Sequence, residues 1–231
     1  MQDFFKKEID FDYSYLDGKE CLNKLTSQEK NELIEHKNDI DFDVREIIVK
    51  RGLPVTHILY LIDGLVKLEI ENDGKPFTVG LIPSHSFIGI ICCFAFEKFD
   101  FTVTALEKSK VSFIDRNIFE NFIKTNGDFA LSLITHMSGT SNGLMHRITS
   151  LSQKNIDGAL SILLLEFSNI YNSTNYKLPM VRRELANMLG YSKESVINTL
   201  SKFNKEGIIE VSDRKISILD KQKLIQISKL G

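Results

Sequence analysis

The sequence contains few cysteines and no long apolar run, and each shortage excludes a class of protein. Its three cysteines, Cys21, Cys92 and Cys93, form neither a CxxC pair nor a disulfide framework, so we expect small, buried apolar side chains at these positions. No stretch approaches the roughly 18 consecutive apolar residues of a membrane span, and the start of the chain lacks the apolar core of a signal peptide. These absences predict a cytoplasmic protein without membrane contact.

Metal-binding and catalytic patterns are also missing. None of the five histidines belongs to an HExxH motif or has another histidine one helical turn away. The sequence shows no nucleophile paired with a base and no glycine-rich phosphate loop. We therefore expect no metal site, no catalytic residue and no enzymatic activity.

Length and charge suggest parts of different character. At about 100–200 residues per domain, 231 residues correspond to one large or two modest domains. The net charge of −2 argues against a uniformly basic surface. However, residues 156–231 carry 11 Lys and Arg against 8 Asp and Glu, whereas residues 1–155 carry 18 against 23. Phosphate binding is therefore expected in the C-terminal part.

The stretch 182–203 predicts two short helices that meet at an angle. Apolar residues recur at helical spacing up to Leu189, and Gly190 can adopt the positive φ that ends a helix. Ser192 can cap a second helix. The apolar side of that second helix consists of Val196, Leu200 and Phe203. This arrangement is typical of a helix-turn-helix, whose second helix enters the DNA major groove.

The residues that follow predict a β-hairpin. Residues 208–211 and 216–219 are short apolar runs around the polar turn 212–215. Two helices followed by a hairpin form a winged helix. The turn alone would suit an ordinary helical hairpin in a domain core equally well, but the hairpin and the local positive charge favour DNA binding.

The N-terminal part predicts a helical segment and then a β domain. Residues 1–40 show an amphipathic helical pattern, and residues 26–29 resemble a helix cap. Between residues 42 and 114, short β runs alternate with turns at roughly ten-residue spacing, and Asn72-Asp73-Gly74 is one expected hairpin turn. No helix-length apolar period interrupts these runs, so we expect a sandwich, barrel or roll.

Helical spacing returns at Asn117 and is longest between about residues 129 and 152. Its apolar positions advance by alternating steps of three and four, as in a coiled coil. The pattern fits either a core helix or a two-fold dimer, which would present two recognition helices about 34–36 Å apart. The expected dimer residues are Ile134, Met137, Ser141, Leu144, Ile148 and Leu151.

Three segments resemble the Crp/Fnr family of bacterial transcription regulators. ILYLIDG at 58–64 is similar to the family's LYYIxxG-type turn, and HSFIG at 85–89 resembles its GDFIG segment. Residues 185–209 are similar to the family's helix-turn-helix from end to end. The order of β-roll, long helix and winged helix extends the resemblance over nearly the whole chain.

The resemblance implies an α+β fold with a cyclic-nucleotide-binding-like β-roll, which is a jelly roll, a long dimerisation helix and a C-terminal winged helix-turn-helix. We expect an effector domain with its N-terminal helix at residues 1–116, a dimerisation helix and hinge at 117–155, and a DNA-binding domain at 156–231. An effector in the roll would reposition the DNA-binding domains through the long helix.

The expected effector site departs from that of the family's cyclic-AMP-binding members. Those members carry a Glu and an Arg-Ser pair at positions where this sequence has Ile90 and Phe99-Asp100. A cyclic phosphate would face Asp100 with no arginine nearby, so we expect no cyclic nucleotide there. An iron–sulfur sensor needs four cysteine ligands, and the sequence has three cysteines.

Apolar residues surround the expected pocket. They fit an apolar or aromatic ligand, a collapsed roll without a ligand, or haem, although no histidine stands out as its axial ligand. We expect no cofactor. The expected ligand-binding residues are Ile88, Gly89, Ile90 and Phe99.

The resemblance also assigns DNA contacts. Base-contacting positions fall on Lys193, Glu194, Ile197 and Asn198, and phosphate-contacting ones on Arg182, Ser192 and Lys202. Glu194 can accept a hydrogen bond from cytosine, Asn198 can pair with adenine, and Ile197 can touch a thymine methyl group.

The sequence therefore predicts a homodimeric, sequence-specific transcription regulator that binds double-stranded DNA. It would respond to an unknown small-molecule effector, and it would contact RNA polymerase if it is an activator. The alternative hypothesis is a sensor of an apolar ligand or haem, or a protein-interaction module, whose helix-turn-helix does not bind DNA.

Overall fold

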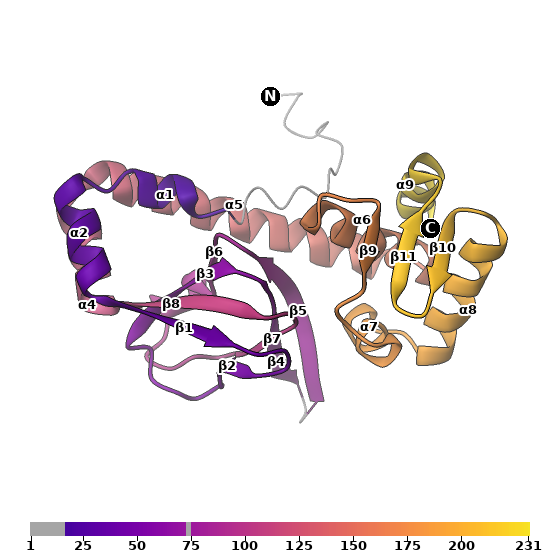
Figure 1. Ribbon diagram of the computed structural model, residues 1–231, viewed down its shortest axis with the longest axis horizontal. Coiled ribbons are helices and arrows are strands. Elements are labelled where there is room, and N and C mark those ends of the chain that lie inside the picture. Colours follow the sequence, from indigo (N-terminus) through magenta and orange to yellow (C-terminus); the bar gives the residue numbers. More distant parts are fainter. Residues whose placement is uncertain (1–16, 73–74) are drawn as a thin grey trace. The chain divides into compact units, whose positions relative to one another are not determined.

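The computed structural model describes residues 17–72 and 75–231 (Figure 1). The chain forms two compact units, and the boundary between them falls between Met145 and His146, inside helix α5 (Gly127–Ser152). One unit contains a β-roll and the other contains the helix-turn-helix. Because one helix contributes to both units, the expected limits at residues 116 and 155 stay a proposal.

Two four-stranded antiparallel sheets form the roll (Figure 1). One sheet has the strand order β1-β8-β3-β6 and the other has the order β2-β7-β4-β5. The strands are β1 (Lys37–Phe42), β2 (Ile47–Val49), β3 (His57–Asp63), β4 (Leu65–Asn72), β5 (Lys75–Pro83), β6 (Ser86–Ile88), β7 (Thr102–Ala105) and β8 (Ser109–Asp115). The predicted α+β fold with an N-terminal β domain is thereby confirmed.

The roll encloses an apolar core to which strands of both sheets contribute. In β7, Val103 and Ala105 are buried, whereas Thr102 and Thr104, which alternate with them, are partly exposed. The ring of Phe87 in β6 lies 5.7 Å from that of Phe119 in α4 (Arg116–Thr125), edge to face. This core therefore joins the sheets to the helices that follow them.

The helical segment expected for residues 1–40 is shorter than predicted. Helices α1 (Lys19–Asn23) and α2 (Ser27–Glu35) form, and Thr26 and Glu29 make the predicted capping box on α2. Residues 37–40 belong to β1 instead, because the whole of β1 pairs with β8. Most side chains of β1 are exposed, so no apolar alternation marks the strand. The expected turn at Asp73-Gly74 and the residues before 17 lie outside the described part of the chain.

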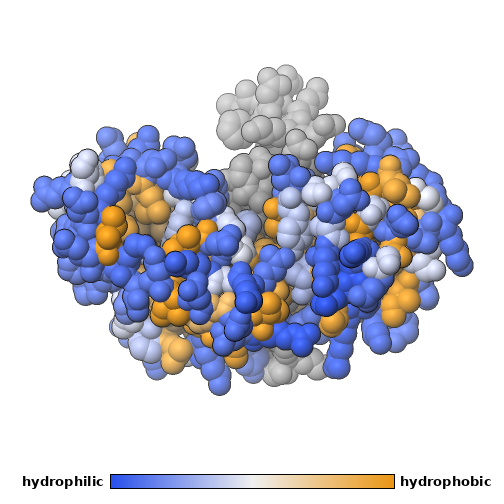
Figure 2. All heavy atoms as spheres, in the orientation of Figure 1, coloured by the Kyte–Doolittle hydropathy of each residue, from blue (hydrophilic) through white to orange (hydrophobic). Residues whose placement is uncertain are grey.

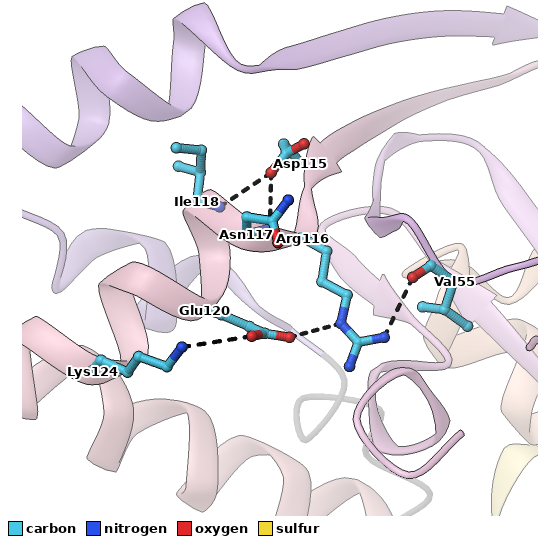
Figure 3. Close-up of polar contacts among 7 residues, drawn as sticks. All are labelled: Val55, Asp115, Arg116, Asn117, Ile118, Glu120 and Lys124. Carbon is cyan, nitrogen blue, oxygen red and sulfur yellow. Dashed lines mark hydrogen bonds and ion pairs between the residues drawn. The ribbon is translucent and has the colours of Figure 1, made fainter. Parts of the chain in front are cut away.

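A cluster around Arg116 fixes the start of α4 (Figure 3). The side chain of Asp115 accepts hydrogen bonds from two backbone N–H groups of the first turn, at 2.8 and 3.2 Å. Arg116 Nε donates to Glu120 Oε1 at 2.7 Å, and Arg116 Nη1 donates to the Val55 carbonyl at 3.3 Å. Helix α4 is thereby anchored to the loop that precedes β3.

Asn126 separates α4 from α5, where the sequence pattern suggested no interruption. Its backbone is extended, and its Oδ1 accepts a hydrogen bond from Phe129 N at 3.0 Å. An asparagine side chain that bonds to the backbone in this way competes with a continuous helix. A further short helix that the sequence did not predict is α3 (Ile90–Cys93).

Helix α6 (Ile156–Ile170) forms the centre of the second unit, since every residue from Gly158 to Ser168 is buried. The remaining elements are β9 (Asn175–Lys177), α7 (Arg182–Leu189), α8 (Lys193–Lys205), β10 (Ile209–Ser212), β11 (Lys215–Ile218) and α9 (Lys221–Leu230). The predicted hairpin of β10 and β11 forms, and β9 adds a third strand beside β11. Neither β9 nor α9 was predicted.

Hydrophilic side chains cover most of the face drawn in Figure 2, and apolar ones occur in small groups. Small apolar groups of this kind are ordinary on protein surfaces. In the described part of the chain, no helix is both long and apolar enough to span a bilayer. Within residues 17–72 and 75–231, no three His, Cys, Asp or Glu side chains form a group that could hold a metal ion.

A buried ion pair joins the end of α5 to α6. Arg147 Nε donates to Glu166 Oε1 at 2.9 Å, and Arg147 Nη2 donates to Oε2 at 3.4 Å. The two side chains are 8% and 1% exposed. Each charge is tolerated in the interior because the other charge is present.

Replacing Glu166 by alanine leaves the buried guanidinium without this carboxylate. We expect Glu166→Ala to lower the free energy of unfolding of the second unit by about 3–5 kcal/mol, measured by urea denaturation. The double variant Arg147→Met/Glu166→Leu replaces the ion pair with an apolar contact, so its free energy of unfolding should fall far less. Equal losses for the two variants would contradict this account.

Candidate nucleic-acid interface

Helices α7 and α8 meet at a tight turn. Gly190 adopts a φ of +73°, and Tyr191 N donates to the Ala186 carbonyl at 3.0 Å, which closes α7. The Ser192 hydroxyl accepts a hydrogen bond from Ser195 N at 3.0 Å and caps α8. The structure therefore confirms the predicted helix-turn-helix and both residues expected at its turn.

Helix α8 has a buried side and an exposed side. Val196, Leu200 and Phe203 are at most 3% exposed, as predicted. The exposed side carries the other residues expected at the DNA surface, namely Lys193, Glu194, Ile197, Asn198 and Lys202. This side thus presents hydrogen-bond donors, an acceptor and an apolar group along one helix.

Lys202 has an acidic partner on another helix. Its Nζ lies 2.6 Å from Oδ2 of Asp157, in the first turn of α6. Asp157 Oδ1 also accepts a hydrogen bond from the Thr199 hydroxyl at 3.1 Å. The hydrogen bond to Asp157, and then the attraction of its charge, raise the pKa of the Lys202 ammonium. The lysine is therefore positively charged at neutral pH, and its charge is paired with a carboxylate of the same chain.

Arg182 lies at the start of α7, apart from the exposed side of α8. Its Nη2 donates to the Asp213 carbonyl, in the turn between β10 and β11, at 2.5 Å. The Nη1 atom is buried and has no hydrogen-bond partner within the described residues. Burial lowers the pKa of this guanidinium, and the charge of Asp213 opposes that shift. Arg182 thus ties the helix-turn-helix to the wing, which consists of the hairpin of β10 and β11 with β9 beside it.

The wing places two lysines opposite each other. Lys177 in β9 and Lys215 in β11 are cross-strand partners, and both are exposed. Like charges directly opposite each other on a sheet repel and destabilise it. An anion bound beside the two lysines would reduce this repulsion. The sequence pattern gives little sign of Lys177, because only the alternation around the buried Tyr176 marks its three-residue strand.

Both parts of the chain match known protein families. Residues 159–227 match the Crp-like helix-turn-helix domain, and residues 40–126 match the cyclic nucleotide-binding domain. The chain is similar to Electron transport regulator A of Shewanella oneidensis, with 27% identity over 209 residues that cover 88% of this chain and 82% of that protein. The chain belongs to the Crp/Fnr family of transcription regulators. The family is non-enzymatic, and its members bind DNA through the helix-turn-helix domain.

Solved structures show the same Crp/Fnr fold. FixK2 from Bradyrhizobium japonicum has a TM-score of 0.75 at 18% identity, over 84% of this chain and 98% of that chain. A protein from Eubacterium rectale assigned to the crp/fnr family has a TM-score of 0.73 at 22% identity, over 90% and 97% of the two chains. At such low identity these likenesses show the fold alone.

In this Crp/Fnr regulator, apolar side chains fill the interior of the roll at the expected effector site. Ile88, Ile90 and Phe99 are at most 7% exposed. Gly89 adopts a φ of +62°, and a side chain there would overlap the ring of Phe101. The rings of Phe99 and Phe101 lie 5.5 Å apart, edge to face. The four expected ligand-binding residues therefore line a packed interior.

One premise about this site was wrong, because an arginine does lie beside Asp100. Arg51 Nε is 3.2 Å from Asp100 Oδ1, and the two side chains are 47% and 56% exposed. The distance of 49 positions along the sequence concealed this pair. Both charges are at the surface and face each other, so Arg51 adds no cation to the packed interior.

The thiols of the Crp/Fnr regulator lie inside the β-roll unit. Cys21 and Cys93 are buried, as expected, and Cys92 is partly buried. Burial raises the pKa of each thiol, and it raises that of Cys93 to about 12. The protonated forms therefore dominate near neutral pH, which suits packing and disfavours thiolate chemistry.

The residues expected at the dimer interface lie on α5. Ile134 is 61% exposed and Ile148 is 52% exposed. Met137, Ser141, Leu144 and Leu151 are partly exposed. The apolar positions of the predicted heptad pattern are thus incompletely covered within one chain.

Proposed function

We propose that this protein is a homodimeric, sequence-specific transcription regulator that reads operator DNA with α8. The observation that supports this most directly is the exposed polar side of α8, opposite a side that is fully buried. In the helix-turn-helix geometry, the N-terminal part of such a helix contacts base edges in the major groove. Because the proposed target is chromosomal DNA, we expect the protein to work in the cytoplasm.

Base contacts are proposed for four residues near the start of α8. Glu194 accepts from cytosine N4, and Asn198 makes a bidentate pair with adenine. Ile197, which is 41% exposed, contacts a thymine methyl group. Lys193 donates to guanine or to a phosphate.

Phosphate contacts are proposed around this base-reading region. Ser192 offers its hydroxyl at the N-terminus of α8, where backbone N–H groups also favour an anion. Arg182 brings positive charge to the base of the wing, and the opposed Lys177 and Lys215 extend it. Lys202 is a further proposed contact, although Asp157 already engages it.

Dimerisation through α5 is proposed because its exposed apolar positions follow the coiled-coil spacing. Two copies related by a two-fold axis would present recognition helices to successive major grooves. A change of state in the roll would then shift the population of binding-competent dimers. An activator of this kind would also contact RNA polymerase.

We also propose that the roll does not bind cyclic nucleotides. A cyclic phosphate needs a cationic or amide cradle, whereas the interior around Ile90 and Phe99 is apolar and packed. Opening this interior for a nucleotide would break apolar contacts without supplying an ion-pair partner. The packing favours either an apolar effector that displaces aromatic side chains or no ligand at all.

The proposed base and phosphate roles can be separated by mutation. Glu194→Ala should cost about 1–3 kcal/mol on the preferred operator and relax preference at one base position. Arg182→Ala should weaken binding to all sequences and reduce the salt slope by about 0.9. Fluorescence anisotropy with selected and random duplexes over a salt series measures both effects. Equal loss on both duplexes for Glu194→Ala would refute its base-reading role.

The proposed dimer can be tested by placing a charge on α5. Ile134→Asp should weaken the dimer by more than about 2 kcal/mol, or roughly thirtyfold in its dissociation constant, because a carboxylate would be buried without a partner. Sedimentation equilibrium gives this constant. Thr135→Asp is a matched control at an exposed position outside the heptad pattern. A parallel loss in the control would argue against the interface.

Cyclic AMP is expected to leave this protein unchanged. Because the residues at the expected effector site are apolar and buried, millimolar-range titration should neither raise the melting temperature nor alter DNA affinity. Differential scanning fluorimetry and anisotropy measure the two quantities. A saturable rise in melting temperature would overturn the proposal that the roll has lost this ligand.

A further inference from the structure

The carboxylate of Asp157 is directed to the recognition helix instead of capping its own helix. In the first turn of α6, the capping role is filled by Asn155, whose Oδ1 accepts from the backbone N–H groups of Asp157 and Gly158 at 3.0 Å each. The two oxygens of Asp157 are thereby available for Thr199 and Lys202. These partners lie about one turn apart on α8, so one carboxylate binds two side chains on the same side of that helix.

The environments of the partners differ, and so do the consequences of the two bonds. Thr199 is 5% exposed, and its bond fixes α8 against the central helix α6. The Lys202 side chain is 52% exposed, and that of Asp157 is 25% exposed. A half-exposed ion pair adds little to folding stability. Its larger effect is on the charge that α8 presents to an approaching polyanion.

Lys202 borders the surface that is proposed to meet DNA. It lines a shallow hollow on α8 together with Asn198, Ser201, Lys205 and Glu206. A lysine at this place would normally neutralise a phosphate and release a counterion, which strengthens binding to any sequence. Here Asp157 already neutralises the ammonium at 2.6 Å. A phosphate must displace this carboxylate and approach its negative charge.

We propose that Asp157 competes with DNA phosphate for Lys202 and thereby lowers affinity for random DNA more than it lowers base readout. Asp157 is then a specificity-determining residue that acts through Lys202, although it touches no base. The inference rests on the proposed DNA-binding role of α8. It requires that sequence-independent affinity rise when the carboxylate loses its charge.

The experiment compares Asp157→Asn with wild type. Asparagine keeps an oxygen that can accept from Thr199 and removes the charge that holds Lys202. Affinity for a labelled random duplex should rise about three- to tenfold near about 0.1 M salt, with a salt slope steeper by about 0.9. Affinity for the duplex that wild type selects from a random pool should rise less than this. The ratio of specific to random affinity should therefore fall, and an unchanged ratio would overturn the specificity role.

A second variant identifies the cation. Adding Lys202→Gln to Asp157→Asn should return the salt slope to the wild-type value. Glu210→Gln is a matched control, because it removes an exposed carboxylate of the same unit without freeing Lys202, and its slope should stay near wild type. Circular dichroism melting verifies that each variant is folded.

Several outcomes would overturn the inference. An unchanged slope in Asp157→Asn, or a steep slope that persists in the double variant, shows that Lys202 is not the released cation. A loss of affinity at unchanged slope shows that Asp157 only supports the structure. Wild-type protein that binds neither duplex refutes the proposed function as well, whereas normal wild-type binding with unaltered variants refutes this inference alone.

Discussion

The burial of one side of α8 is the constraint on which the rest of the DNA-binding unit depends. A helix of 13 residues is marginal in water by itself. It is held here because Val196, Leu200 and Phe203 enter a core built around α6, whose middle residues are all buried. Because this side supplies the stability, the exposed side is free to carry residues that contribute to recognition instead of folding.

Two of the side chains that the family resemblance assigns to phosphates already have partners in the protein. Arg182 donates to a carbonyl of the wing turn, and Lys202 is paired with Asp157. The arginine keeps its positive charge while it positions the wing. The lysine has its charge compensated by an anion. A basic residue on a recognition surface therefore contributes to DNA affinity only as far as its other partners allow.

The roll surrounds Gly89 with apolar side chains. Gly89 takes the left-handed conformation at the start of α3, and the two sheets enclose a core. The side chains around that point are aromatic and aliphatic, and the charges of Arg51 and Asp100 lie at the surface. Fold membership thus leaves the ligand open, because ligand binding depends on the groups that line the site.

The sequence by itself determined the local features of this protein. Gly190, Ser192 and the apolar spacing of α8 predicted the helix-turn-helix, since turn chemistry and helical period act within a few residues. The tertiary structure alone decided the features that join distant segments. These are the pairing of polar β1 with β8, the addition of β9 to the wing, and the capture of Lys202 by Asp157. The physical reason is that strand pairing and ion pairing depend on distance in space, which a linear pattern does not contain.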